Sequence, residues 1–223
     1  MRSIAQVISF VMHPLMIPTY MLIILMIINP YAFSVSSIGD RTSQLLIIRL
    51  FLSTFFIPAF AVLMLRFLGL VNSIELKERE ERIGPYIITG IFYLWMFANF
   101  LNDSQIPPIY ASFLLGATIA LFLAFFINLF SKISAHTVGM GGLLGMVVLT
   151  YITHRQYDPV VISSSILGTF EMSMTFILML VILLSGIVGT CRLFLQAHEQ
   201  SDLYGGYLVG VATQFIAFVI LMG

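Results

Sequence analysis

The sequence of 223 residues is 60% hydrophobic and only 9% charged, and its ten Lys and Arg balance its ten Asp and Glu. A soluble globular domain carries roughly a quarter charged residues, so this composition excludes that class. Without net charge or a basic segment, the chain gives no indication of a nucleic-acid partner. We therefore expect an integral membrane protein whose partner is the lipid bilayer.

Seven apolar segments follow one another along the chain, each long enough to cross roughly 30 Å of hydrocarbon as a helix. They cover residues 4–28, 45–68, 85–101, 108–130, 137–153, 160–188 and 203–222. Their apolar runs are continuous and do not alternate, which favours helices over a membrane barrel. We predict an all-α fold, a single polytopic transmembrane bundle over residues 1–223. Because the segments 85–101 and 137–153 are short, six crossings are an alternative to seven.

The first segment contains His13-Pro14 and Pro18, which predict a kink or break in its helix. It lacks a small-residue cleavage site and continues apolar to Ile28, so we interpret it as a retained span and not as a signal peptide. We interpret His13 as a packing residue of a kinked helix. The alternative is a polar group exposed at a broken helix.

Three polar clusters lie between the apolar segments, at residues 75–85 (ELKEREERIGP), 131–137 (SKISAHT) and 191–202 (CRLFLQAHEQSD). Two spans separate the first cluster from the second, and two more separate the second from the third. An even number of crossings returns a chain to the same side of a membrane. We therefore expect all three clusters to meet at one membrane surface.

The third cluster places His198 and Asp202 four residues apart, which makes them neighbours on one face if the segment is helical. A carboxylate in that position can accept one imidazole proton, fix the tautomer and direct the other nitrogen outward. Such an imidazole can act as a nucleophile or a base. Arg192 adds a planar fork suited to phosphate or carboxylate. The alternative is a group of solvated charges at the start of an interfacial helix.

The other two clusters are ambiguous when each is taken alone. His136 begins a span, where a histidine at the membrane interface needs no function. Lys77 and Arg82 are interleaved with glutamates, and pairs four residues apart such as Glu78 and Arg82 also fit a self-neutralised surface helix.

Taken together, the three clusters resemble the signature of the type 2 phosphatidic acid phosphatase superfamily, which carries K-x6-R-P, P-S-G-H and S-R-x5-H-x3-D in this order. The third motif is matched by Cys191-Arg192, His198 and Asp202 at the same spacing, with cysteine in place of the first serine. The glycine-rich LYGGYLVG that follows is also similar to the family.

The two earlier motifs are matched less closely. Residues 133–136 (ISAH) keep the serine and the histidine of the second motif. The first motif keeps the spacing from Lys77 to Pro85, but Gly84 stands where the family has arginine, and Arg82 is the natural substitute. The resemblance covers a phosphatase-like core at residues 77–210 and leaves the spans in residues 1–70 outside it.

By that resemblance the protein would be a membrane lipid phosphatase, which hydrolyses a phosphate or diphosphate monoester of a membrane lipid without a metal or other cofactor. His198 would be the nucleophile that forms a phosphohistidine, Asp202 would orient it, and His136 would protonate the leaving group. The phosphate oxygens would be bound by Lys77, Arg82 and Arg192. The resemblance also implies a bacterial inner membrane and a catalytic face outside the cytoplasm.

Two other classes of function fit parts of the same sequence. His198-Glu199-x-x-Asp202 is one residue away from the zinc-peptidase motif H-E-x-x-H, with His136 as a third ligand. Glu171 lies near the middle of the segment 160–188, where an ionisable residue indicates either a buried structural acid or, with His13 and Asn99, the path of a small transporter. A family member that has lost its activity is a third alternative.

Overall fold

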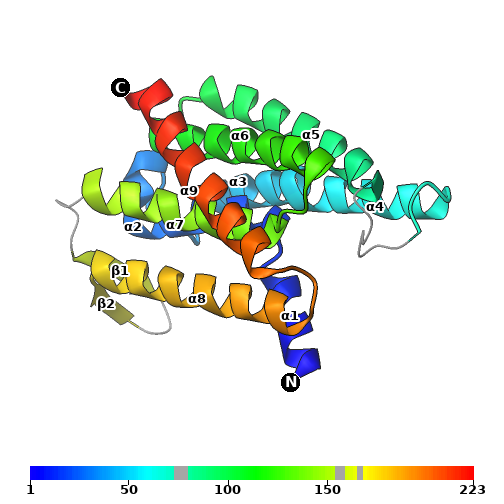
Figure 1. The fold of residues 1–223 in the computed structure, drawn as a ribbon. Coiled ribbons are helices and arrows are strands. Elements are labelled where there is room, and N and C mark those ends of the chain that lie inside the picture. The colour runs from blue at the N-terminus through cyan, green and yellow to red at the C-terminus, as the bar shows by residue number, and fades with distance from the viewer. Residues whose placement is uncertain (73–79, 154–158, 165–167) are drawn as a thin grey trace.

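The computed structural model of the chain describes residues 1–72, 80–153, 159–164 and 168–223. Seven helical segments in these ranges are long and apolar enough to cross a membrane, so the chain is an integral membrane helical bundle (Figure 1). They are Arg2–Ile28, Arg41–Phe67, Glu80–Leu101, Pro108–Phe130, Ala135–Thr153, Met174–Phe194 and Gln200–Met222. The predicted fold class is confirmed, and the two short segments are helices of full spanning length.

The first two spans are broken helices. The first consists of α1 (Arg2–Val11), the 3-10 turn η1 (Pro14–Met16) and α2 (Ile17–Ile28), and the second of α3 (Arg41–Phe51), the π-helical turn η3 (Leu52–Phe56) and α4 (Ile57–Phe67). The short turn η2 (Pro30–Phe33) follows α2. The first break falls at His13-Pro14, as predicted, because proline cannot donate the hydrogen bond that would continue the helix. The two breaks, η1 and η3, pack against each other.

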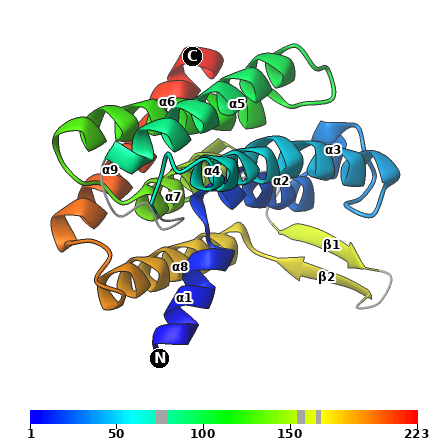
Figure 2. The same ribbon diagram turned by 90° about the vertical axis from the view of Figure 1, so that its right-hand side faces the viewer.

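Five further spans follow the two broken helices. They are α5 (Ile83–Leu101), which follows the turn η4 (Glu80–Arg82), then α6 (Pro108–Phe130), α7 (Ala135–Thr153), α8 (Met174–Phe194) and α9 (Gln200–Met222). Helix α9 packs against both α6 and α7, while α5 packs on α6 and α8 on α7 (Figures 1 and 2). A β-carbon at Gly141 of α7 would lie only 2.6 Å from the carbonyl oxygen of Tyr207 of α9, so glycine permits this close approach.

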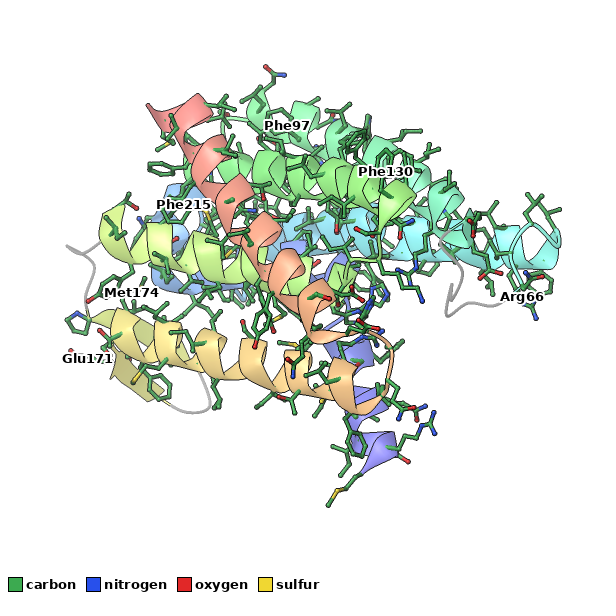
Figure 3. All side chains as sticks on the ribbon, viewed as in Figure 1. Arg66, Phe97, Phe130, Glu171, Met174 and Phe215 are labelled. Carbon is green, nitrogen blue, oxygen red and sulfur yellow. The ribbon has the colours of Figure 1, made fainter. Side chains whose placement is uncertain are left out.

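The predicted span 160–188 begins later than expected. Its first part is an antiparallel hairpin of β1 (Val160–Ser164) and β2 (Gly168–Met172), in which Val161 faces Glu171. Helix α8 starts at Met174, where the hydroxyl oxygen of Ser173 accepts the Phe176 N–H at 3.1 Å as an N-cap. The prediction that Glu171 lies inside a span is therefore wrong, since this residue is exposed on β2 (Figure 3).

Helix α1 does not continue along α2 but lies across the C-terminal part of α8 (Figures 1 and 2). The turn that follows it therefore reaches the end of the bundle where α8 ends and α9 begins. Large apolar side chains such as Phe130 and Trp95, exposed by 71% and 51%, cover the outside of the spans, as contact with lipid requires.

Candidate functional site

Four of the six predicted site residues line one cavity of about 320 Å³: Arg82, His136, Arg192 and His198. Arg82 ends η4, His136 is the second residue of α7, Arg192 lies in the last turn of α8, and His198 lies in the connection to α9. The structure therefore brings the three polar clusters to one end of the bundle, as an even number of crossings requires. A cavity of this size lies in the range of small-molecule sites.

Of the other two predicted residues, Lys77 lies outside the described part of the chain. Asp202 does not line the cavity. It lies behind His198, with an oxygen 3.2 Å from the imidazole Nδ1.

The pair of His198 and Asp202 forms without the helix that the spacing suggested. His198 lies in the loop before α9, and Asp202 is the third residue of that helix. The same carboxylate oxygen accepts the Glu199 backbone N–H at 3.3 Å, which is a helix-capping interaction. Because an ionised carboxylate only accepts hydrogen bonds, Nδ1 of His198 carries the proton and Nε2 keeps its lone pair. The cap therefore fixes both the position and the tautomer of the imidazole.

The surroundings of His198 keep it neutral. Its side chain is only 4% exposed, and burial lowers its pKa to about 4 against the opposing effect of the Asp202 hydrogen bond. The positive charges of Arg192 and Arg82 lower the pKa further, which places both guanidinium groups within electrostatic reach of the imidazole. At neutral pH this side chain is an unprotonated base beside two cations.

The second and third clusters are joined by a backbone hydrogen bond. The N–H of Ser134, just before α7, donates to the carbonyl oxygen of Asp202 at 3.3 Å. With the glycine-mediated packing of α7 on α9, this bond fixes the start of α7, and so His136, against the start of α9. The two histidines therefore face one cavity from neighbouring helix ends.

The first span supplies two contacts that the sequence did not reveal. His136 donates its Nε2 proton to the carbonyl oxygen of Ser9 at 3.0 Å, since a carbonyl can only accept, and this leaves Nδ1 as the other functional nitrogen. His13 also lines the cavity, and its ring meets that of His136 edge to face with centroids 5.5 Å apart.

His13 is held at the break between α1 and η1. Its Nδ1 accepts the Leu15 N–H at 3.3 Å, and its ring meets Phe55 of the π-helical turn at a centroid distance of 6.2 Å. The sequence marked His13-Pro14 as a break, but no local pattern connects position 13 with position 136. Only the crossing of α1 over α8 brings the third histidine to the site.

The zinc-peptidase interpretation requires a set of metal ligands. Among the residues that the structure describes, no three His, Cys, Asp or Glu side chains are grouped closely enough to hold a metal ion. Asp202, which stands at the position of the motif's second ligand, does not line the cavity and bonds Nδ1 of His198, and two arginines line the same cavity. The described residues therefore suit an anion better than a divalent cation.

Comparisons with protein-family models, with curated proteins and with solved structures find no match to this chain. The motif residues and the geometry of the cavity carry the functional argument.

Proposed function

We propose that this protein is an integral-membrane lipid phosphatase, which hydrolyses a phosphate or diphosphate monoester of a membrane lipid through a phosphohistidine. The observation that carries the proposal is the convergence of two histidines and two arginines from three distant polar clusters on one cavity. Two guanidinium groups suit the oxygens of a phosphate, because each can donate two parallel hydrogen bonds.

In the first step His198 attacks the phosphorus atom. Its Nε2 lone pair forms the P–N bond while the bond from phosphorus to the ester oxygen breaks. Asp202 stabilises the positive charge that develops on the imidazole, through the Nδ1–H bond of 3.2 Å. The departing oxygen takes the Nδ1 proton of His136 in its doubly protonated form, which the bound phosphate stabilises, while Nε2–H stays bonded to the Ser9 carbonyl; His136 is left neutral. The lipid leaves as an alcohol or, from a diphosphate, as a monophosphate.

In the second step water replaces the lipid. Neutral His136 takes a proton from the water as its oxygen attacks phosphorus, and the P–N bond breaks. Inorganic phosphate and the starting form of His198 result. The negative charge of the phosphoryl group stays against Arg82 and Arg192 throughout, and Lys77 is the third phosphate ligand that we propose.

The position of the cavity suits a lipid substrate. The cationic residues lie where the spans begin or end, while the rest of the lining comes from inside the bundle. A phosphate can therefore bind at the membrane surface while the chains of its lipid remain in an apolar environment. Without that arrangement, extraction of each chain methylene into water would cost about 0.8 kcal/mol.

The test is phosphate release by the purified protein from a panel of phosphatidic acid, phosphatidylglycerophosphate, a prenyl diphosphate and a lipid A phosphate. We expect release from at least one lipid, unchanged by a chelator and lost in His198→Ala. Lys132→Ala is the matched control, because this exposed cation lies in the second cluster but does not line the cavity.

Two results would overturn the proposal. One is the absence of phosphate release from every lipid by folded wild-type protein, together with solute flux in reconstituted vesicles, which would indicate a transporter. The other is an activity that a chelator removes and zinc restores, which would favour the metallopeptidase.

A further inference from the structure

The cavity extends from the cationic residues deep into the bundle. On one side its lining runs from Arg82 at the end of η4 to Tyr93 of α5, and on another from Ala124 to Phe113 of α6. In each stretch the two end residues are eleven positions apart, which at 1.5 Å per helical residue is about 16 Å. The cavity therefore reaches about half-way across a hydrocarbon core of roughly 30 Å.

Between the arginines and the inner end of the cavity, much of the lining consists of small apolar residues. Small residues of α6 line the cavity at the helical spacing of one face, and two glycines of α7 line it from the other side. These residues are Ala117, Ala120, Ala124, Gly139 and Gly142. Because these residues are small and uncharged, this part of the cavity has space for an alkyl chain and suits its apolar surface.

Gln214 of α9 interrupts this apolar lining beside Gly142, which lies six residues, about 9 Å, along α7 from His136. Its side chain is fully buried and lines the cavity, and neither its amide oxygen nor its amide nitrogen has a hydrogen-bond partner among the described residues. Such a group inside a membrane is costly unless something binds it.

Two glycines make room for this amide. A β-carbon at Gly116 would lie 2.6 Å from Oε1 of Gln214, and one at Gly142 would lie 3.4 Å from Nε2. The amide therefore fills a slot between α6 and α7 that side chains at these positions would narrow. The fold therefore keeps a hydrogen-bonding group in place within the apolar lining of the cavity.

We propose that Gln214 hydrogen-bonds a carbonyl group on the chain of the substrate, so that the enzyme selects lipid phosphates with acyl chains over plain polyprenyl phosphates. This inference rests on the proposed phosphatase function and deepens it. An ester or amide carbonyl satisfies the amide N–H of Gln214, whereas a polyprenyl chain offers neither donor nor acceptor. A site built to bind a polar group rejects an analogue that lacks this group, because its own polar atoms are left unpaired.

The experiment compares three substrates with the purified full-length protein: a diacyl phosphatidic acid, its diether analogue without carbonyl groups, and farnesyl phosphate. We expect kcat/KM for the diacyl lipid to exceed that for the diether by about 10- to 100-fold, the range of one lost hydrogen bond to a buried group. Gln214→Leu is expected to bring the two values within about threefold of each other. Gln105→Leu, an exposed residue in the loop before α6, is the matched control.

A second variant keeps Gln214 and displaces its amide. Gly116→Ala is expected to reduce the preference for the diacyl lipid in the same way, while Gly186→Ala, whose β-carbon would have no atom within 4 Å, leaves the preference unchanged. Equal turnover of ester and ether lipids by the wild type, a preference that survives in both variants, or faster turnover of farnesyl phosphate would overturn the inference and leave the phosphatase function standing. Failure to release phosphate from these three substrates and from every other lipid of the phosphatase panel would overturn both.

Discussion

His136 donates its Nε2 proton to the carbonyl oxygen of Ser9, 3.0 Å away, although 127 residues separate the two in the chain. This contact ties the fifth span to the first and leaves only Nδ1 of His136 for proton transfer. A backbone carbonyl in this role orients an imidazole in the way that buried carboxylates do elsewhere.

The proposed role of His136 predicts a dependence on the leaving group. A general acid matters most when the departing oxygen is strongly basic, so His136→Ala should slow release of a lipid alkoxide by about 100-fold or more. In the first turnover, before water attack limits the rate, release of nitrophenolate, which needs no proton, should fall less than about tenfold. Rates with the two substrates measure the difference, and equal losses on both would contradict the role of His136 as the acid.

Asp202 is predicted to act through the orientation of His198. Asp202→Asn keeps an oxygen that can accept the Glu199 N–H, so the start of α9 is preserved. The neutral amide is a weaker acceptor for the Nδ1 proton of His198, so this tautomer of the imidazole is less favoured. We expect kcat to fall at least about a hundredfold with little change in the thermal unfolding midpoint. A variant with unchanged kcat would show that the bond between His198 and Asp202 is structural only.

Substitution of an arginine in the cavity should weaken binding of the lipid phosphate, whereas substitution of another cation at the same membrane surface should not. Arg192→Gln is expected to lower kcat/KM by about 10- to 100-fold, because it removes a charge-assisted donor to the phosphate, and Arg192→Lys should restore only part of it. Lys132, exposed at the same end of the bundle, is the control position. Equal effects of Arg192→Gln and Lys132→Gln would indicate general surface attraction and not a binding site.

The pKa of His198 predicts how stability depends on pH. Burial lowers this pKa to about 4, whereas an unfolded histidine titrates near 6.5. Between these values the unfolded chain holds a proton that the folded chain does not, so the free energy of unfolding falls as the pH is lowered through this window. Thermal unfolding midpoints at pH 7 and pH 4.5 measure the effect, and His198→Gln should lose less stability than the wild type. Parallel losses in both proteins would contradict the lowered pKa.

The sequence predicted the helical class and the meeting of the polar clusters, because the length of the apolar segments and the number of crossings follow from the order of apolar and polar residues along the chain. It did not predict the hairpin before α8. Val160, Val161 and Ile162 are apolar like a span, and only the Ser173 cap, a local feature within a long apolar run, marks where the helix begins.

The contacts made by residues 1–70 show a second limit of prediction from the sequence. The family resemblance begins at Lys77, yet Ser9 and His13 contact His136. These contacts depend on how α1 turns across α8 after the break at Pro14. No spacing rule links a carbonyl in one span to an imidazole in another, so only the tertiary structure reveals them.

The most direct test of the account is to trap the covalent intermediate. The protein is mixed with a lipid whose phosphate carries ³²P, the reaction is quenched in base within one turnover, and the labelled residue is identified by peptide mapping. We expect an acid-labile phosphoryl group on His198 of the wild type and no label in His198→Ala. A label on another residue, or full phosphate release by His198→Ala, would contradict it.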